Sequence, residues 1–123
     1  MAARVVDASA VGALLFGEPN GAAVAERLRE ADLMAPALLW FEVANVCRKK
    51  IRGHPDRRDA LTMAFGLLER MAIEVVEVEH GEALVLAEAA GLTAYDASYL
   101  WLARRLGLEL VTLDAQLAIA AGG

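Results

Sequence analysis

The chain has 123 residues, a net charge of -5, and a hydrophobic content of 58%. This length is typical of one domain that buries roughly two-thirds of its unfolded surface around a single core. The acidic balance argues against a protein that binds nucleic acid through an overall positive charge. We therefore expect one domain over residues 1–123, with apolar surface left for a partner, either a second copy of the chain or a different protein.

Cysteine use and hydropathy predict the compartment. Cys47 is the only cysteine, so no internal disulfide can form and a reducing compartment is expected. No uncharged run reaches the ~20 strongly apolar residues of a membrane span. Asp7 interrupts the only early apolar stretch, so no signal peptide is expected. We expect a cytoplasmic protein with no membrane segment.

Strand-like and helix-like segments alternate along the chain. In chain order, the sequence predicts a strand at residues 4–7, helices at 10–16 and 22–30, a strand at 33–35, helices at 37–51 and 55–71, the clearest strand at 73–78, helices at 81–90 and 94–106, a strand at 109–112, and a helix at 115–121. This alternation predicts an α/β fold with a mainly parallel central sheet of four or five short strands flanked by helices.

Four carboxylates, Asp7, Glu42, Asp96 and Asp114, stand alone in apolar sequence. A buried carboxylate must be paired, hydrogen-bonded or metal-bound, because an uncompensated buried charge is very unfavourable. Asp7 and Asp114 fall just past predicted strands, where open parallel sheets gather ligand-binding groups. Glu42 lies inside a predicted helix on one face with Asn45, and Asp96 opens another helix. We expect the four acids to meet at one cleft.

Helix capping is the alternative explanation. Thr93 and Asp96 resemble a capping box, Ser9 is a candidate cap for the helix after the first strand, and Asp114 for the last helix. Each cap is worth about 1 kcal/mol. Capping does not explain Glu42, because an acid in the middle of a helix serves no terminus. The joint pattern favours a site.

Converging carboxylates call for a cation. Two carboxylates ~4 Å apart repel by roughly 4 kcal/mol at an effective dielectric constant of about 20. Oxygen ligands without converging His or Cys select Mg²⁺ or Mn²⁺ rather than zinc, and we expect His54 and His80 at the surface. Because such an ion polarises a phosphoryl oxygen and activates water, phosphodiester hydrolysis is the favoured chemistry.

Six of the twelve basic side chains lie within residues 48–58. This density suits contacts with a phosphate backbone, and Arg48, Lys49, Lys50 and Arg52 are the candidates for such contacts. A solvated helix end is an equally good interpretation, because cations are favourable at the C-terminal end of a helix.

Four segments resemble the signature segments of the PIN-domain nucleases, in their usual order and approximate spacing. They are Val6-Asp7-Ala8-Ser9, Trp40-Phe41-Glu42-Val43-Ala44-Asn45-Val46, Leu92-Thr93-Ala94-Tyr95-Asp96-Ala97-Ser98-Tyr99 and Val111-Thr112-Leu113-Asp114-Ala115-Gln116-Leu117. The resemblance extends over nearly the whole chain. The single-domain length is similar to that of the VapC-type toxins of bacterial and archaeal toxin–antitoxin pairs.

The resemblance implies a PIN-like endoribonuclease that depends on Mg²⁺ or Mn²⁺. It makes Asp7, Glu42, Asp96 and Asp114 the acidic quartet that binds the metal ion and carries catalysis. It further implies that the Ser9 and Thr112 hydroxyl groups orient a carboxylate or a metal-bound water, and that Asn45 reaches the same cleft. The implied reaction is in-line attack of metal-activated water on RNA, which leaves a 5′-phosphate and a 3′-hydroxyl.

The partners implied are an RNA substrate, an inhibiting antitoxin and a second copy of the chain. Helices near residues 24–28 and 38–46 are the candidate contact surfaces. Two alternatives remain open: a non-toxin PIN nuclease in RNA processing, and a catalytically idle module with an acidic binding pocket. A phosphoacceptor receiver domain is disfavoured, because the chain lacks paired acids after its first strand and a lysine after its last.

Overall fold

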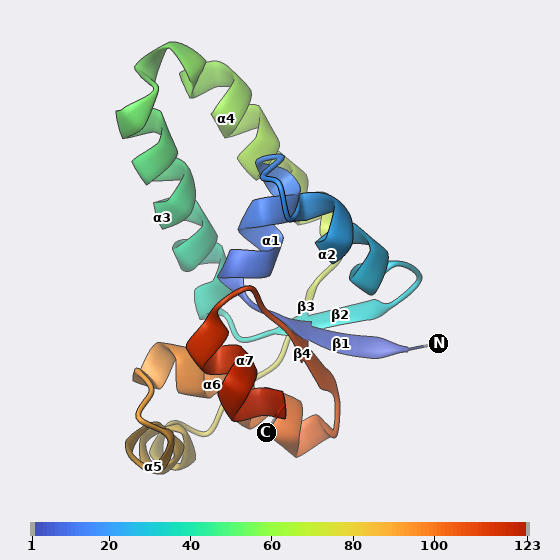
Figure 1. Cartoon of the computed structure of the whole chain (residues 1–123), viewed down its shortest axis with the longest axis vertical. Coiled ribbons are helices and arrows are strands. Elements are labelled where there is room, and N and C mark those ends of the chain that lie inside the picture. Colours follow the sequence, from blue (N-terminus) through green and yellow to red (C-terminus); the bar gives the residue numbers. More distant parts are fainter. Residues whose placement is uncertain (1, 123) are drawn as a thin grey trace.

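A four-stranded parallel sheet lies at the centre of the computed structural model, which describes residues 2–122 (Figure 1). The strands are β1 (Ala3–Val6), β2 (Asp32–Ala35), β3 (Glu74–Val75) and β4 (Glu109–Val111). Their order is β3-β2-β1-β4, and each neighbouring pair is parallel. The predicted α/β fold with a mainly parallel sheet of four or five strands is confirmed.

Helices cover both faces of this sheet, with α1 to α4 on one side and α5 to α7 on the other in Figure 1. Their bounds are α1 (Ala8–Leu15), α2 (Gly21–Leu28), α3 (Leu38–Gly53), α4 (Arg58–Gly66), α5 (His80–Ala90), α6 (Ala94–Leu106) and α7 (Ala115–Gly122). Short 3-10 helices, η1 (Pro55–Arg57) and η2 (Leu67–Met71), flank α4. The helices α3 and α4 project together from the sheet as a hairpin.

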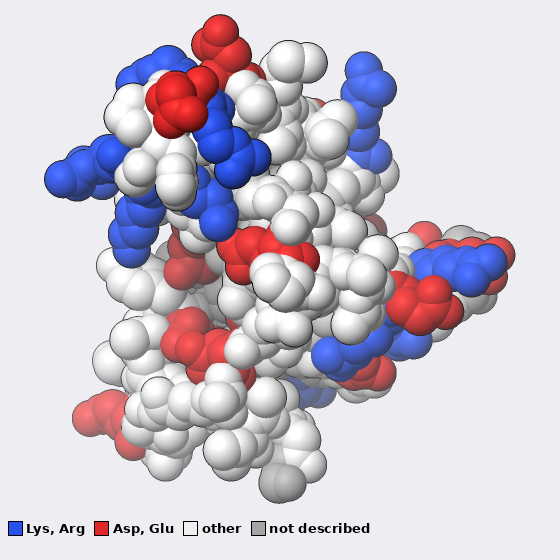
Figure 2. Space-filling view, turned by 45° about the horizontal axis from the view of Figure 1, so that its top comes forward, with Lys and Arg blue, Asp and Glu red and all other residues white. Residues whose placement is uncertain are grey.

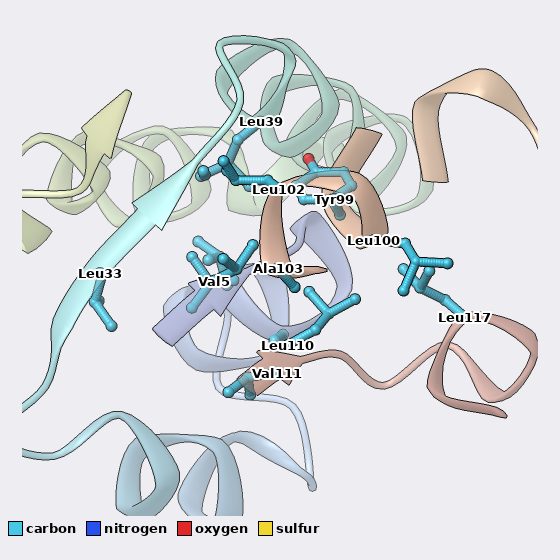
Figure 3. Close-up of a cluster of buried hydrophobic side chains, with 14 of the residues drawn as sticks. Val5, Leu33, Leu39, Tyr99, Leu100, Leu102, Ala103, Leu110, Val111 and Leu117 are labelled. Atoms are coloured by element: carbon cyan, nitrogen blue, oxygen red, sulfur yellow. The ribbon is translucent and has the colours of Figure 1, made fainter. Parts of the chain in front are cut away.

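The core lies between the sheet and the helices packed on it. Val5 of β1 and Val111 of β4 have no exposed surface, as expected for parallel strands covered on both faces. Leu102 and Tyr99 of α6 pack into the same cluster (Figure 3). Each large apolar side chain buried in this way stabilises the fold by about 1.5–3 kcal/mol. This packing fixes α6 against the carboxyl ends of β1 and β4.

The predicted helix at residues 55–71 is broken into η1, α4 and η2. Gly66 ends α4, and a side chain placed there would contact no other part of the protein. The next turns tighten to a 3-10 helix, which is frequent at helix ends. The backbone then reverses at Ala72, which has a φ of 53°.

The predicted strand at residues 73–78 is wrong in length, because only Glu74–Val75 pairs as β3. The Val76 N–H still donates to the Ala35 carbonyl at 3.0 Å. Beyond Ala35 the neighbouring chain continues through Pro36 into α3, so it presents no further strand backbone. Residues 76–78 keep an alternating pattern of burial, but they lie beyond the paired residues of β3.

One predicted contact surface is wrong. Val24 and Leu28 are buried in the core, so residues 24–28 do not present the apolar surface that was expected for a partner. Within residues 38–46, Leu39 and Val43 are also core residues, whereas Phe41 is 80% exposed. None of the helices in residues 2–122 combines the length and hydropathy that a membrane crossing requires.

Candidate active site

Asp7 lies at the carboxyl end of β1 and is only 4% exposed. Its Oδ1 accepts hydrogen bonds from the Ser9 hydroxyl group at 2.7 Å and from the Ala10 N–H at 3.0 Å. Asp7 is therefore the N-cap of α1, and the alternative in which Ser9 caps this helix is wrong. Ser9 lies inside the first turn, where its hydroxyl group supports Asp7 instead.

Thr112 connects the end of β4 to Asp7. Its buried hydroxyl group donates to Asp7 Oδ2 at 2.5 Å and accepts from the Asp114 N–H at 3.0 Å. The Ser9 hydroxyl oxygen accepts from the Leu113 N–H at 2.9 Å. Both hydroxyl groups thus lie against Asp7, where the resemblance to PIN nucleases placed them.

Asp114 and Asp96 each lie at the start of a helix. Asp114 Oδ1 accepts from the Leu117 N–H at 2.8 Å, which confirms Asp114 as the cap of α7. The Asp96 N–H donates to the Thr93 hydroxyl oxygen at 3.1 Å, which confirms Thr93 as the cap of α6. Capping and a place in the cleft are compatible, since a cap fixes the carboxylate at the same edge of the sheet.

Glu42 is half-buried on α3, and its Oε1 accepts a hydrogen bond of 2.6 Å from the Tyr99 hydroxyl group. Asn45 shares a small pocket of about 240 Å³ with Glu42, as the helical spacing predicted. Tyr99 was missed as a site residue in the sequence. The sequence could have indicated Tyr99, because it lies three residues after Asp96 on the same predicted helix, and this spacing puts both side chains on one face.

The four acids form one electrostatic cluster. Burial raises the pKa of Asp7, against the lowering effect of its three hydrogen bonds, and repulsion from Asp114 raises it further. Burial also raises the pKa of Glu42, against the lowering effect of the hydrogen bond from Tyr99. Repulsion from the charges of Asp96 and Asp7 raises this pKa further. The pKa of Asp96 is raised by burial and by repulsion from Asp114 and Asp7. The structure therefore brings all four predicted acids within electrostatic reach of one another.

Within residues 2–122, no three His, Cys, Asp or Glu side chains lie close enough together to hold one metal ion in common. The four carboxylates interact electrostatically without converging on one point. None of the ion pairs formed within residues 2–122 involves them, so no lysine or arginine neutralises the cluster in this part of the chain. Clustered carboxylates without a cationic partner have the oxygen chemistry that a divalent cation such as Mg²⁺ or Mn²⁺ prefers. His54 and His80 are exposed, as predicted.

The basic cluster covers the far half of α3 and the start of α4. Figure 2 shows Lys and Arg side chains gathered at the end of the α3–α4 hairpin, with acidic side chains on the same face nearer the middle of the molecule. Arg48, Lys49 and Arg52 are exposed. Lys50 differs from them, because it pairs with Glu18 at 2.9 Å and lies 5.8 Å from the centre of the Phe16 ring.

A parallel α/β fold with clustered acids at the carboxyl edge of its sheet is consistent with the family resemblance. The family model described as PIN domain matches residues 4–123. The chain therefore belongs to the PIN-domain family. Among PIN proteins it is similar to ribonucleases of the VapC type.

Two curated relatives and one solved structure support this assignment. Ribonuclease VapC3 from Pyrobaculum aerophilum is 36% identical over 122 residues, which cover 93% of this chain and 91% of that protein. Ribonuclease VapC12 from Mycobacterium tuberculosis is 31% identical, with 96% and 92% covered. The crystal structure of PAE2754 from Pyrobaculum aerophilum is 30% identical and superposes with a TM-score of 0.80 over 99% of this chain and 87% of that chain.

Proposed function

We propose that this protein is an endoribonuclease toxin of the VapC type that depends on Mg²⁺ or Mn²⁺. The observation that carries the proposal is the cluster of four mutually repelling acids without a basic partner among the described residues. The cluster lies in a chain that is 36% identical to a protein named as a ribonuclease. An acidic cleft repels RNA unless a cation intervenes, and this favours a metal-dependent reaction.

In this proposal Asp7, Glu42, Asp96 and Asp114 hold the ion. When bound, the ion would supply a Lewis acid for a phosphoryl oxygen and lower the pKa of water. Ser9 and Thr112 fix Asp7 with neutral hydroxyl donors, so they orient this carboxylate while leaving its charge available to a cation. Asn45 lies beside Glu42 with its amide exposed, where it can donate to the RNA.

The basic side chains of α3 would hold RNA phosphates. Arg48, Lys49 and Arg52 are exposed on α3. Figure 2 shows Lys and Arg side chains gathered at the end of the hairpin, on a face that also carries acidic side chains. Lys50 was expected to belong to this group. Its ion pair with Glu18 instead favours a role in holding α3 against the turn after α1.

Cleavage of a circular RNA tests the endoribonuclease proposal. A circle has no ends, so linear products report only internal hydrolysis, and 5′-phosphate ends on those products would match the reaction expected for this family. The Asp96→Asn variant, prepared in the same way, controls for contaminating nucleases. Circles that stay intact with the wild-type protein, or that both proteins cut equally, would contradict the proposal.

The proposal includes an antitoxin partner, which the VapC names of the relatives support, and a cytoplasmic location. A groove of about 640 Å³ between β3, α5 and α6 offers apolar side chains such as Val76 and Tyr95, and it suits an apolar segment of a partner. Self-association into a dimer remains part of the proposal, since Phe41 and Tyr95 are strongly exposed.

Growth of the native host separates the toxin from the alternatives. A toxin expressed alone should arrest growth, and coexpression of the product of a neighbouring gene should restore growth and yield a complex. An RNA-processing nuclease would cut RNA without arresting growth. An idle acidic module would do neither.

A further inference from the structure

Tyr99 is a core residue whose hydroxyl group contacts the acid cluster. Its side chain is 1% exposed and packs in the core around α6 (Figure 3). Its hydroxyl group donates to Oε1 of Glu42 at 2.6 Å, a short bond of the kind formed with a charged acceptor. The ring is therefore fixed by packing, and the hydroxyl group has a charged partner.

This hydrogen bond joins the two helices that carry Glu42 and Asp96. Glu42 belongs to α3, whereas Tyr99 and Asp96 lie three residues apart on α6, on one face of that helix. A long side chain such as glutamate has three rotatable bonds and ordinarily samples several rotamers at a half-exposed position. The bond from a rigid phenol restricts Glu42 to one arrangement relative to Asp96.

A phenol suits this task because it is neutral. The ordinary pKa of a phenol is ~10, so the hydroxyl group keeps its proton near pH 7 and remains a donor. A lysine or arginine at this place would orient Glu42 equally well but would cancel its charge. Tyr99 engages Oε1 and leaves both the charge of Glu42 and its second oxygen, Oε2, for a cation.

We propose that Tyr99 is a positioning residue, which presents Glu42 to a divalent cation together with Asp96 and thereby sets the affinity of the site for that cation. The proposal rests on the proposed function, since it assumes that Glu42 binds a metal ion. Tyr99 acts through Glu42 and contacts neither the metal ion nor the RNA. Its hydroxyl group should therefore matter to metal binding more than to folding.

Mn²⁺ binding to the purified full chain, measured by calorimetry without RNA, tests this directly. Tyr99→Phe keeps the ring in the core and removes the hydroxyl group, so Mn²⁺ affinity should fall by about 10-fold to 100-fold, the range for groups that orient metal ligands. The kcat for RNA should fall while KM for RNA stays within about twofold. Trp101→Phe is the matched control, because it removes a donor on the same helix whose acceptor, Glu82, lies outside the acid cluster, and it should change neither value.

A double-mutant cycle with Glu42→Gln identifies the route of the effect. If Tyr99 acts through Glu42, then Tyr99→Phe should change Mn²⁺ affinity by less than about twofold in the Glu42→Gln background. An equal loss in both backgrounds would overturn the proposal. So would wild-type affinity in Tyr99→Phe, or a Tyr99→Phe protein that does not fold, which would make the hydroxyl group structural. A wild-type protein that binds no Mn²⁺ would instead contradict the proposed function itself.

Discussion

The hydroxyl group of Thr112 donates a hydrogen bond to Oδ2 of Asp7 across 105 positions of sequence. It links the carboxyl end of β4 to that of β1, and the same hydroxyl oxygen accepts the Asp114 N–H. The position of Asp114 is thus coupled to that of Asp7 through one buried side chain.

Thr112→Val should therefore damage both the site and the fold. The valine leaves Asp7 Oδ2 and the Asp114 N–H without this partner, at a cost of about 1–3 kcal/mol in the free energy of unfolding. RNA cleavage should fall by roughly 10-fold to 100-fold. Urea unfolding and a cleavage assay measure the two effects, and Thr112→Ser should recover most of both. Full activity in Thr112→Val would show that Asp7 needs no support from β4.

Asp96→Asn should separate activity from stability. Loss of this ligand should reduce RNA cleavage by more than about a hundredfold, since even groups that only orient ligands have effects of about that size. The raised pKa of Asp96 means that its charged form is less favourable in the folded than in the unfolded chain. Its contribution to stability without metal is lost as pH rises through the folded pKa. At neutral pH, metal-free Asp96→Asn should thus unfold at or above the wild-type midpoint. A clearly lower midpoint would contradict this reasoning.

Asp7→Ala should behave differently from Asp96→Asn. Asp7 is buried, caps α1 and accepts three hydrogen bonds. Its removal leaves the Thr112 and Ser9 hydroxyl groups without their acceptor. Loss of the cap alone typically costs about 0.5–2 kcal/mol. Metal-free Asp7→Ala should therefore be less stable than the wild type, whereas Asp96→Asn should not. Thermal unfolding of metal-free Asp7→Ala and Asp96→Asn, measured in parallel, tests these two expectations.

Metal affinity should depend on pH above the ordinary carboxyl range. Burial and mutual repulsion raise the pKa values of Asp7, Glu42 and Asp96 above 3.8 and 4.5, so protons compete with the cation at a higher pH than at isolated carboxylates. Mn²⁺ affinity should therefore fall when pH is lowered from about 8 to about 5. Glu109→Gln is the control. Glu109 lies outside the acid cluster, and the hydrogen bond from Arg27 lowers its pKa. An affinity independent of pH over this range would argue against carboxylate ligands.

The basic side chains of α3 should set the salt dependence of RNA binding. Combined replacement of Arg48, Lys49 and Arg52 by Ala should weaken binding to many RNA sequences, and should reduce the slope of log affinity against log salt by about 0.7 for each lost phosphate contact. Mn²⁺ affinity should stay unchanged. Arg105→Ala shows the effect of removing one positive charge outside the basic cluster, since Arg105 is exposed on α6 and lies near Trp101. Equal slopes for the wild-type and triple variants would mean that this cluster is a solvated helix end.

The fold and the proximity of the four acids could be predicted from the sequence for a physical reason. Asp7 follows β1 directly and Asp114 lies shortly after β4, and a parallel sheet brings such positions to one edge. The bounds of α6 were predicted because Thr93 and Gly107 are strong cap residues at its two ends. The strand at residues 73–78 was overestimated, because its length depends on how far β2 runs beside it.

Contacts between distant elements were harder to predict. Tyr99 was read only as part of a motif, and nothing in its local sequence shows that its hydroxyl group meets Glu42, 57 positions earlier. Lys50 similarly resembled its basic neighbours until its pairing with Glu18 was known. Periodicity indicates which face of a helix is apolar, but it does not distinguish the core residues Val24 and Leu28 from a surface for a partner.

The dependence of RNA cleavage on metal tests the central claim most directly. Purified protein, freed of any inhibitor and treated with EDTA, should leave a circular RNA intact, and Mn²⁺ or Mg²⁺ added in excess should restore cleavage. The same additions should not activate Asp96→Asn. Cleavage that persists in EDTA, or wild-type rates from Asp96→Asn after metal is restored, would contradict a metal-dependent nuclease site formed by Asp7, Glu42, Asp96 and Asp114.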